Sequence, residues 1–204
     1  MNTLSEAVLL HFAQNRIRWS RVILVLTLLV VVFNGPSRYL EHWVLDTIEL
    51  VGYALLVAAT LLRIWCLIFI GGSKDGELAS QGPYSVVRNP LYIGSLFGIV
   101  GMGLAVGIPL LAAALAVVFG MLYPAVVKQE ERRLLEIFGE PYRRYYERVP
   151  RWIPRWSQYC APEIIVVSTP KVQQGILDGM WYLWAFAFTE LLDILRHHVL
   201  PHFF

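Results

Sequence analysis

Charged residues are scarce in this chain of 204 residues, since Asp, Glu, Lys and Arg make up only 16% of it. Soluble domains carry about 25% charged residues. Here 57% of the residues are hydrophobic, so much of the apolar surface requires a lipid solvent. The net charge is only +2, and the arginines follow apolar runs instead of forming one basic stripe. These features argue against a nucleic-acid partner and for a lipid bilayer.

Cysteine and histidine are also rare. Cys66 lies in an apolar segment and Cys160 in a polar linker, with no C-x-x-C spacing. We therefore expect both cysteines to be reduced and structural, with neither a disulfide framework nor a metal site. The five histidines lie outside the two motifs described below, so the sequence offers no dedicated catalytic base and leaves the catalytic residue unknown.

Long apolar runs are what the chain does have. A helix needs ~20 residues to cross ~30 Å of hydrocarbon, and Gly107-Ile108-Pro109 predicts a tight reversal between the last two runs. The predicted fold is an all-α membrane bundle of four to five transmembrane helices, with a helical hairpin and a cytoplasmic cap made of loops. The four apolar segments are residues 19–34, 47–70, 91–106 and 109–127.

The distribution of basic residues predicts the topology. Lys74 and Arg88 lie between the second and third segments, and eight basic residues follow the fourth, between positions 128 and 155. The opposite loops hold few charges. By the positive-inside rule, the N-terminus and both polar loops are cytoplasmic.

Three regions follow from this pattern. Residues 1–46 form an N-terminal segment with the first span, residues 47–156 the membrane core with its loops, and residues 157–204 a linker and a last helix. Apolar residues recur on one face of residues 175–195, but Asp178, Glu190 and Asp193 interrupt them. This helix therefore either lies on the membrane or packs against the bundle, with a fifth span as the alternative.

The first polar motif runs from Gly82 to Gly94 and reads G-P-Y-S-V-V-R-N-P-L-Y-I-G. Asn89 precedes Pro90, which suits the first turn of a helix. Asn89 thus falls at an N-cap position, where its side chain is expected to bond a free backbone N–H.

The second motif begins at Glu130 and Glu131 and ends at Pro154. Its apolar positions continue a helical face until Gly139 and Pro141, which are expected to end the helix. The tyrosines and arginines that follow are typical of a belt that contacts lipid headgroups.

Together the two motifs read G-P-Y-x-x-x-R-N-P-x-Y-x-G and E-E-x-x-L-x-x-x-F-G-x-x-Y-x-x-Y-x-x-x-V-P-R-x-x-P. This pattern resembles the isoprenylcysteine carboxyl methyltransferase family, to which phospholipid N-methyltransferases are related, over about residues 50–155. The resemblance implies an integral-membrane methyltransferase that uses S-adenosyl-L-methionine without a Rossmann domain. Its acceptor would be a membrane lipid or a lipid-modified molecule with a carboxylate, amine or thiol group.

The resemblance also implies a set of cofactor-binding residues. A carboxylate accepts hydrogen bonds from a ribose or an amino group, and a sulfonium cation is attracted to aromatic faces. Pairing of Glu130 with Lys128 or Arg133 is the alternative to a cofactor contact. The implied residues are Gly76, Glu77, Leu78 and Ala79 through their backbone, Tyr84, the positions Asn89, Pro90, Leu91 and Tyr92 that match R-H-P-x-Y, Glu130, Tyr142 and Tyr145.

The sequence departs from the family pattern at two positions. Asn89 replaces the commoner histidine, so titration near neutral pH is lost. Val126 stands where carboxyl methyltransferases carry an arginine that faces the substrate. Arg63, inside the second segment, and Arg88 are the weaker candidates for a substrate contact, with snorkelling of Arg63 to headgroups as the alternative.

Two other functions remain as alternatives. The first is a non-enzymatic membrane scaffold whose basic and aromatic loops bind headgroups. The second is a reductase that uses a nicotinamide cofactor, because sterol reductases share a related C-terminal region. This chain has too few apolar segments for the longer bundle of such reductases.

Overall fold

The computed structural model describes residues 40–72 and 77–165, with a few isolated positions outside these ranges, among them Glu190. The first apolar segment and most of residues 175–195 fall outside the described residues, as does Gly76. Within the described ranges all regular structure is helical, which confirms the predicted fold class.

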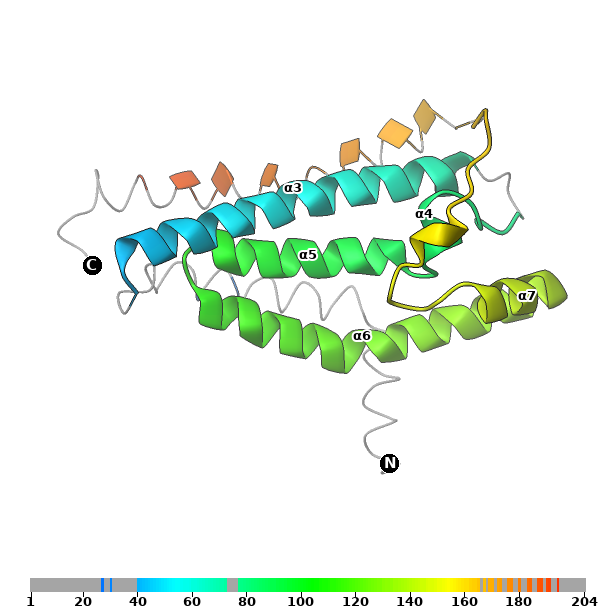
Figure 1. Ribbon diagram of the computed structural model, residues 1–204, viewed down its shortest axis with the longest axis horizontal. Coiled ribbons are helices and arrows are strands. Elements are labelled where there is room, and N and C mark those ends of the chain that lie inside the picture. The colour runs from blue at the N-terminus through cyan, green and yellow to red at the C-terminus, as the bar shows by residue number, and fades with distance from the viewer. Residues whose placement is uncertain are drawn as a thin grey trace, which may run out of the picture.

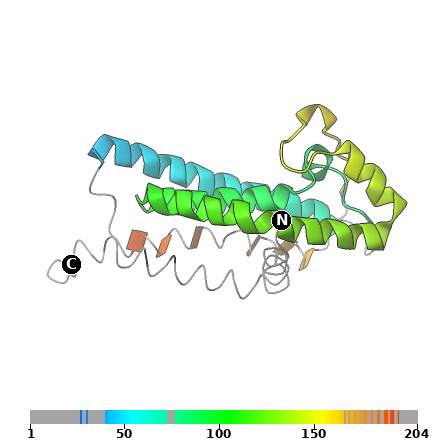
Figure 2. The ribbon, with the colours of Figure 1, turned by 90° about the horizontal axis from the view of Figure 1, so that it is seen from below.

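The membrane core consists of helices α3 (His42–Gly72), α5 (Pro90–Ala105) and α6 (Pro109–Phe138), which run side by side (Figures 1 and 2). Consecutive helices alternate in direction, and α5 packs against both of its neighbours. The end of α3, the start of α5 and the end of α6 therefore meet at one end of the bundle. There the short elements α4 (Pro83–Val86), α7 (Glu140–Arg148) and η1 (Trp156–Gln158) form a cap.

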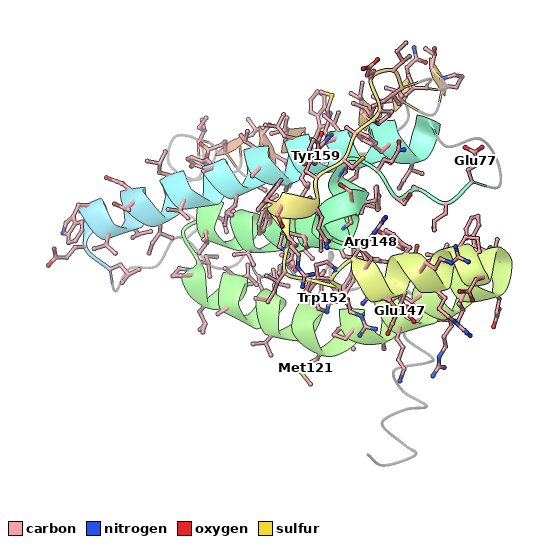
Figure 3. All side chains as sticks on the ribbon, turned by 45° about the vertical axis from the view of Figure 1, so that its right-hand side comes forward. Glu77, Met121, Glu147, Arg148, Trp152 and Tyr159 are labelled. Carbon is pink, nitrogen blue, oxygen red and sulfur yellow. The ribbon has the colours of Figure 1, made fainter. Side chains whose placement is uncertain are left out.

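The outer faces of α3 and α6 are apolar and exposed. Each helix contains a window apolar enough to cross a membrane, and only 22% of each window is buried. A core helix of a soluble protein would be mostly buried, so these faces require lipid. Leu61 on α3 and Met121 on α6 are 62% and 68% exposed, and Met121 points away from the bundle in Figure 3. The chain is a membrane protein.

Helix α5 is the short member of the core. Its 16 residues span about 24 Å, less than the ~30 Å of a bilayer core. Glycines allow close packing along it, because a Cβ on Gly101 would lie 3.0 Å from Gly52 O and a Cβ on Gly103 would lie 2.6 Å from Ala112 Cα. Gly101 thus faces α3, while Gly103 faces α6.

The predicted boundaries hold for α5 and the reversal, where Gly107 adopts a φ of 68°, whereas α3 begins at His42, five residues before the predicted segment. The helical face that was predicted to continue from the fourth segment as far as Gly139 is confirmed. Helix α6 continues without a break to Phe138, because its apolar stripe passes from the membrane core into the cap core. It bends near its middle in Figure 1, and Pro124 inside the helix explains the bend.

A second correction concerns Pro141, which does not end a helix. Gly139 ends α6 with a φ of 57°, and Pro141 then lies in the first turn of α7, where its missing N–H costs no hydrogen bond. Helix α7 is amphipathic, with Tyr142 and Tyr145 buried and Arg144 exposed. Several of the tyrosines and arginines that we predicted to form a belt at the lipid headgroups therefore lie on a helix of their own.

The chain beyond the cap contacts α3 at two points. The hydroxyl of Tyr53 donates to Glu190 Oε1 over 2.9 Å. The rings of Trp65 and Tyr159 have centroids 6.1 Å apart, and Figure 3 shows Tyr159 beside α3. These contacts place η1 and Glu190 against the first helix of the core.

Candidate cofactor and substrate site

The cap forms where the two sequence motifs meet. The backbone N–H of Arg88 donates to Pro150 O over 2.8 Å, and that of Arg155 donates to Val86 O over 2.9 Å. Because backbone bonds need no particular side chain, this pairing depends on the path of the chain rather than on residue type. It brings the first motif into register with the end of the second.

A ring of hydrogen bonds holds the start of α4. The N–H of Gly82 donates to Cys160 O over 2.8 Å, and the N–H of Cys160 donates to Ser85 Oγ over 3.0 Å. Ser85 Oγ in turn donates to Gly82 O over 2.7 Å. Cys160 is thus a backbone partner of the first motif, with an exposed side chain, whereas Cys66 is buried in α3.

The cap core is aromatic. Tyr142, Tyr145 and Val149 are buried together, and Leu78 packs against them. Because Leu78 packs there, the backbone of residues 77–80 lies beside the buried tyrosines. The Tyr145 hydroxyl donates to Tyr84 O over 2.9 Å, which ties α7 to α4.

Tyr84, Tyr142 and Tyr145 of the cap are neutral phenols. Burial raises the pKa of Tyr142 to about 12. It also raises the pKa values of Tyr145 and Tyr84 well above the ordinary value of a phenol. None of the three can act as a base near neutral pH, and the Tyr145 hydroxyl donates to the backbone of Tyr84.

Tyr92 and Glu130 connect α5 to α6 at the edge of the cap. The Tyr92 hydroxyl donates to Glu130 Oε2 over 2.5 Å. None of the ion pairs among the described residues joins Glu130 to Lys128 or Arg133, which was the alternative. A carboxylate that is hydrogen-bonded to Tyr92 thus lies at the boundary between membrane helices and cap.

From Glu130 toward the middle of α6, a row of aromatic rings follows the interface of α5 and α6. The ring of Tyr92 meets that of Tyr123 edge to face, with centroids 5.7 Å apart. Tyr123 stacks on Phe119 with centroids 3.9 Å apart. Val126 is buried and packs against Tyr92, so an apolar side chain occupies the position at which carboxyl methyltransferases carry an arginine.

Glu131 is the residue of this region that the sequence analysis missed. It is buried, and Arg88 Nη1 lies 3.2 Å from its Oε1. Arg151 donates to it twice, from Nε over 3.1 Å and from Nη2 over 2.5 Å. The hydrogen bond to Glu131 raises the pKa of Arg151. The signal was present, because Glu131 shares a helical stripe with Val127 and Leu134, and a charge within an apolar stripe predicts a buried pair.

The structure corrects the role expected for Asn89. Asn89 occupies the N-cap position of α5 but makes no side-chain bond to a helix N–H. Its Nδ2 instead donates to Arg151 O in the second motif over 3.4 Å. Arg63 donates from Nη1 to Ser95 Oγ over 3.2 Å and so lies between α3 and α5.

Most of the residues proposed from the sequence meet at this end of the bundle. Figure 3 shows Glu77, Arg148 and Trp152 around the cap. Arg63 lies deeper along α3. Within residues 40–72 and 77–165, no group of three or more His, Cys, Asp or Glu side chains is placed to hold a metal ion. The predicted residues brought to the cap end are Glu77, Leu78, Ala79, Tyr84, Arg88, Asn89, Pro90, Leu91, Tyr92, Glu130, Tyr142 and Tyr145.

Apolar helices capped at one end by two polar motifs define the chain as a membrane protein whose motifs gather at one end of its helices. The family model for phospholipid methyltransferases matches residues 48–141, which run from α3 to α7. The chain belongs to the family of membrane methyltransferases that includes the phospholipid and isoprenylcysteine methyltransferases.

The comparisons with known proteins give three informative relatives. The chain is 34% identical to the cobalt-zinc-cadmium resistance protein CzcN of Cupriavidus metallidurans, over 95% of this chain and 88% of the relative. It is 33% identical to the nickel-cobalt-cadmium resistance protein NccN of Alcaligenes xylosoxydans xylosoxydans, over 86% and 82%. It is 28% identical to protein-S-isoprenylcysteine O-methyltransferase B of Arabidopsis thaliana, over 61% and 66%. No solved structure matches the chain.

Proposed function

We propose that this protein transfers a methyl group from S-adenosylmethionine to a lipid or lipid-like acceptor at the membrane surface. The observation that carries the proposal is the Tyr92–Glu130 pair, which joins the family's two motifs where the membrane helices enter the cap. When bound, S-adenosylmethionine supplies a methyl group on a sulfonium, which is already a good electrophile.

The residues of the cap suit such a donor. Glu130 offers a carboxylate that accepts hydrogen bonds from hydroxyl or ammonium groups. Tyr92 offers an aromatic face to a cation. The backbone of residues 77–79 lies beside the buried tyrosines because Leu78 packs among them. Tyr84, Tyr142 and Tyr145 stay neutral and form the inner wall.

The work of these residues is alignment and exclusion of water. The acceptor enters from the bilayer along the row formed by Phe119, Tyr123 and Tyr92, which leads from lipid to the carboxylate. A carboxylate or thiolate acceptor needs no base, whereas an amine must lose a proton. With the cap on the cytoplasmic side, as the basic residues after position 127 favour, the donor arrives from the cytosol.

Binding of the methyl donor tests the proposal. Titration calorimetry in detergent is expected to show binding of S-adenosylmethionine to the wild-type protein. Glu130→Gln is expected to weaken it roughly 10- to 100-fold, because a hydrogen bond to a charged group contributes about 1.5–3 kcal/mol. Glu140→Gln is the matched control, since Glu140 is an exposed carboxylate whose ion pairs with Arg143 and Arg144 are long, at 3.9 and 3.6 Å.

Two outcomes would contradict the proposal. Absence of heat above the buffer control for the wild type would favour a scaffold that binds headgroups. Equal affinities of wild type and Glu130→Gln would remove Glu130 from the site. The acceptor is then identified by incubating native membranes with methyl-labelled donor and extracting the lipids. Label in an amine-bearing phospholipid indicates an amine acceptor, and base-labile label indicates an ester.

The relatives named for metal resistance support a physiological setting. We propose that methyl transfer by this protein raises tolerance to cobalt or cadmium, the two metals that the names of both CzcN and NccN contain. A strain without the gene is expected to stop growing at lower concentrations of these ions. The wild-type gene should restore growth and the Glu130→Gln gene should not. If both genes restored growth, metal tolerance would not depend on methyl transfer.

A further inference from the structure

Glu131 joins three parts of the cap through one buried carboxylate. It lies on α6, and its side chain is 7% exposed. Arg88, which precedes α5, approaches it to 3.2 Å, and Arg151, which follows α7, donates to both of its oxygens. A single side chain thus links α6 to both sequence motifs.

Glu130, which precedes Glu131 on α6, makes the contact with Tyr92 that we propose for the donor site. Successive side chains of a helix point about 100° apart, so Glu130 reaches Tyr92 while Glu131 reaches Arg88. Arg88 precedes Tyr92 by four residues. The two adjacent carboxylates therefore hold both ends of one short piece of chain, which sets the rotation of α6 relative to α5.

Arg88 makes two further contacts besides the one with Glu131. Its guanidinium carbon lies 3.8 Å from the centroid of the Tyr146 ring, a cation–π contact. Its backbone N–H donates to Pro150 O. Apolar side chains of similar size often stabilise a protein as well as a buried ion pair does, whereas ion pairs and hydrogen bonds impose a direction. The presence of ion pairs and hydrogen bonds around Glu131 therefore indicates that these contacts fix the geometry of the cap.

We propose that Glu131 is a positioning residue for the methyl-donor site. Through Arg88 and Arg151 it holds Tyr92 opposite Glu130, without touching donor or acceptor itself. The expected effect of Glu131 on donor affinity rests on the proposed function, whereas its expected effect on the structure of the cap does not.

Donor affinity is the first measurement. Glu131→Gln is expected to weaken binding of S-adenosylmethionine at least tenfold, and Glu140→Gln to leave it unchanged. Unchanged affinity of Glu131→Gln would overturn the proposal. If instead the wild type itself does not bind the donor, the proposed function fails. Hydrogen exchange then tests whether Glu131 holds the cap together.

Hydrogen exchange tests the cap without any ligand. In the wild type the amides of Arg88 and Arg155 are bonded to the opposite motif and should exchange slowly. In Glu131→Gln they are expected to exchange at least tenfold faster, while in Glu140→Gln they should match the wild type. Equal exchange in Glu131→Gln and the wild type would show that Glu131 does not hold the cap.

A triple variant separates geometry from stability. In Arg88→Met, Glu131→Leu, Arg151→Met no buried charge is left unpaired, so the protein is expected to fold, with a helical circular dichroism spectrum and a melting temperature near that of the wild type. Its donor affinity should nevertheless be as low as that of Glu131→Gln. Wild-type affinity in the triple variant would overturn the positioning role and leave only the cost of an unpaired buried charge.

Discussion

Replacing Gly52 with alanine is expected to force α3 away from α5 and to destabilise the bundle by about 3 kcal/mol, the upper range for overpacking. A Cβ at Gly52 would lie 2.3 Å from Ala105 N and 2.8 Å from Leu104 C. These are backbone atoms, which cannot turn aside as a side chain can. The loss should appear as a lower thermal unfolding midpoint in detergent.

Gly120→Ala is the matched control for this substitution. Gly120 lies in α6, and a Cβ there would have no heavy atom within 4 Å. Alanine favours a helix over glycine by about 1 kcal/mol, so this variant should be at least as stable as the wild type. If Gly52→Ala melts like Gly120→Ala, the close approach of α3 and α5 is wrong.

Gly82→Ala is expected to disrupt the cap while the membrane helices persist. Gly82 has a φ of 59° and a ψ of −128°, a conformation essentially restricted to glycine, and strain of this kind costs about 1–3 kcal/mol. In addition, a Cβ would lie 2.3 Å from the ring of Phe69. Because the N–H of Gly82 bonds Cys160 O, displacement should release the start of α4 and weaken donor binding. Limited proteolysis of the cap and calorimetry of donor binding measure the two effects.

Gly139→Ala separates backbone strain from the clash. Gly139 has nearly the same backbone angles, with a φ of 57° and a ψ of −124°, but a Cβ there would meet no heavy atom within 4 Å. The additional loss in Gly82→Ala therefore measures the contact with Phe69. Equal losses in both variants would show that the packing of Phe69 against the cap contributes nothing.

Local patterns in the sequence predicted much of this architecture. The apolar runs identified α3 and α5, and Gly107 with Pro109 identified the reversal between α5 and α6. The same reasoning failed where two local signals competed. Pro141 after Gly139 read as the end of helical structure, but a proline in a first turn is equally consistent with a new helix, and α7 begins there.

The residues of the proposed site were predicted as a set, but their partners were not. Asn89 read as a helix cap because that is its local option, whereas its side chain bonds Arg151 O, 62 positions further along the chain. The sequence analysis gave Glu131 no role, although its place in an apolar stripe of α6 indicated a buried position. Both errors arise because local sequence does not tell which distant segment lies nearest.

The sequence by itself determined that this chain enters a membrane, where its helices turn, and which two motifs share one end of the bundle. These properties follow from composition, periodicity and backbone restrictions at glycine and proline, all of which act over a few residues. Only the tertiary structure decided that Tyr92 pairs with Glu130 and that Arg88 and Arg151 share Glu131. Those pairs depend on the rotation of α6 against α5 and on the return of the chain after α7, which packing over the whole bundle sets.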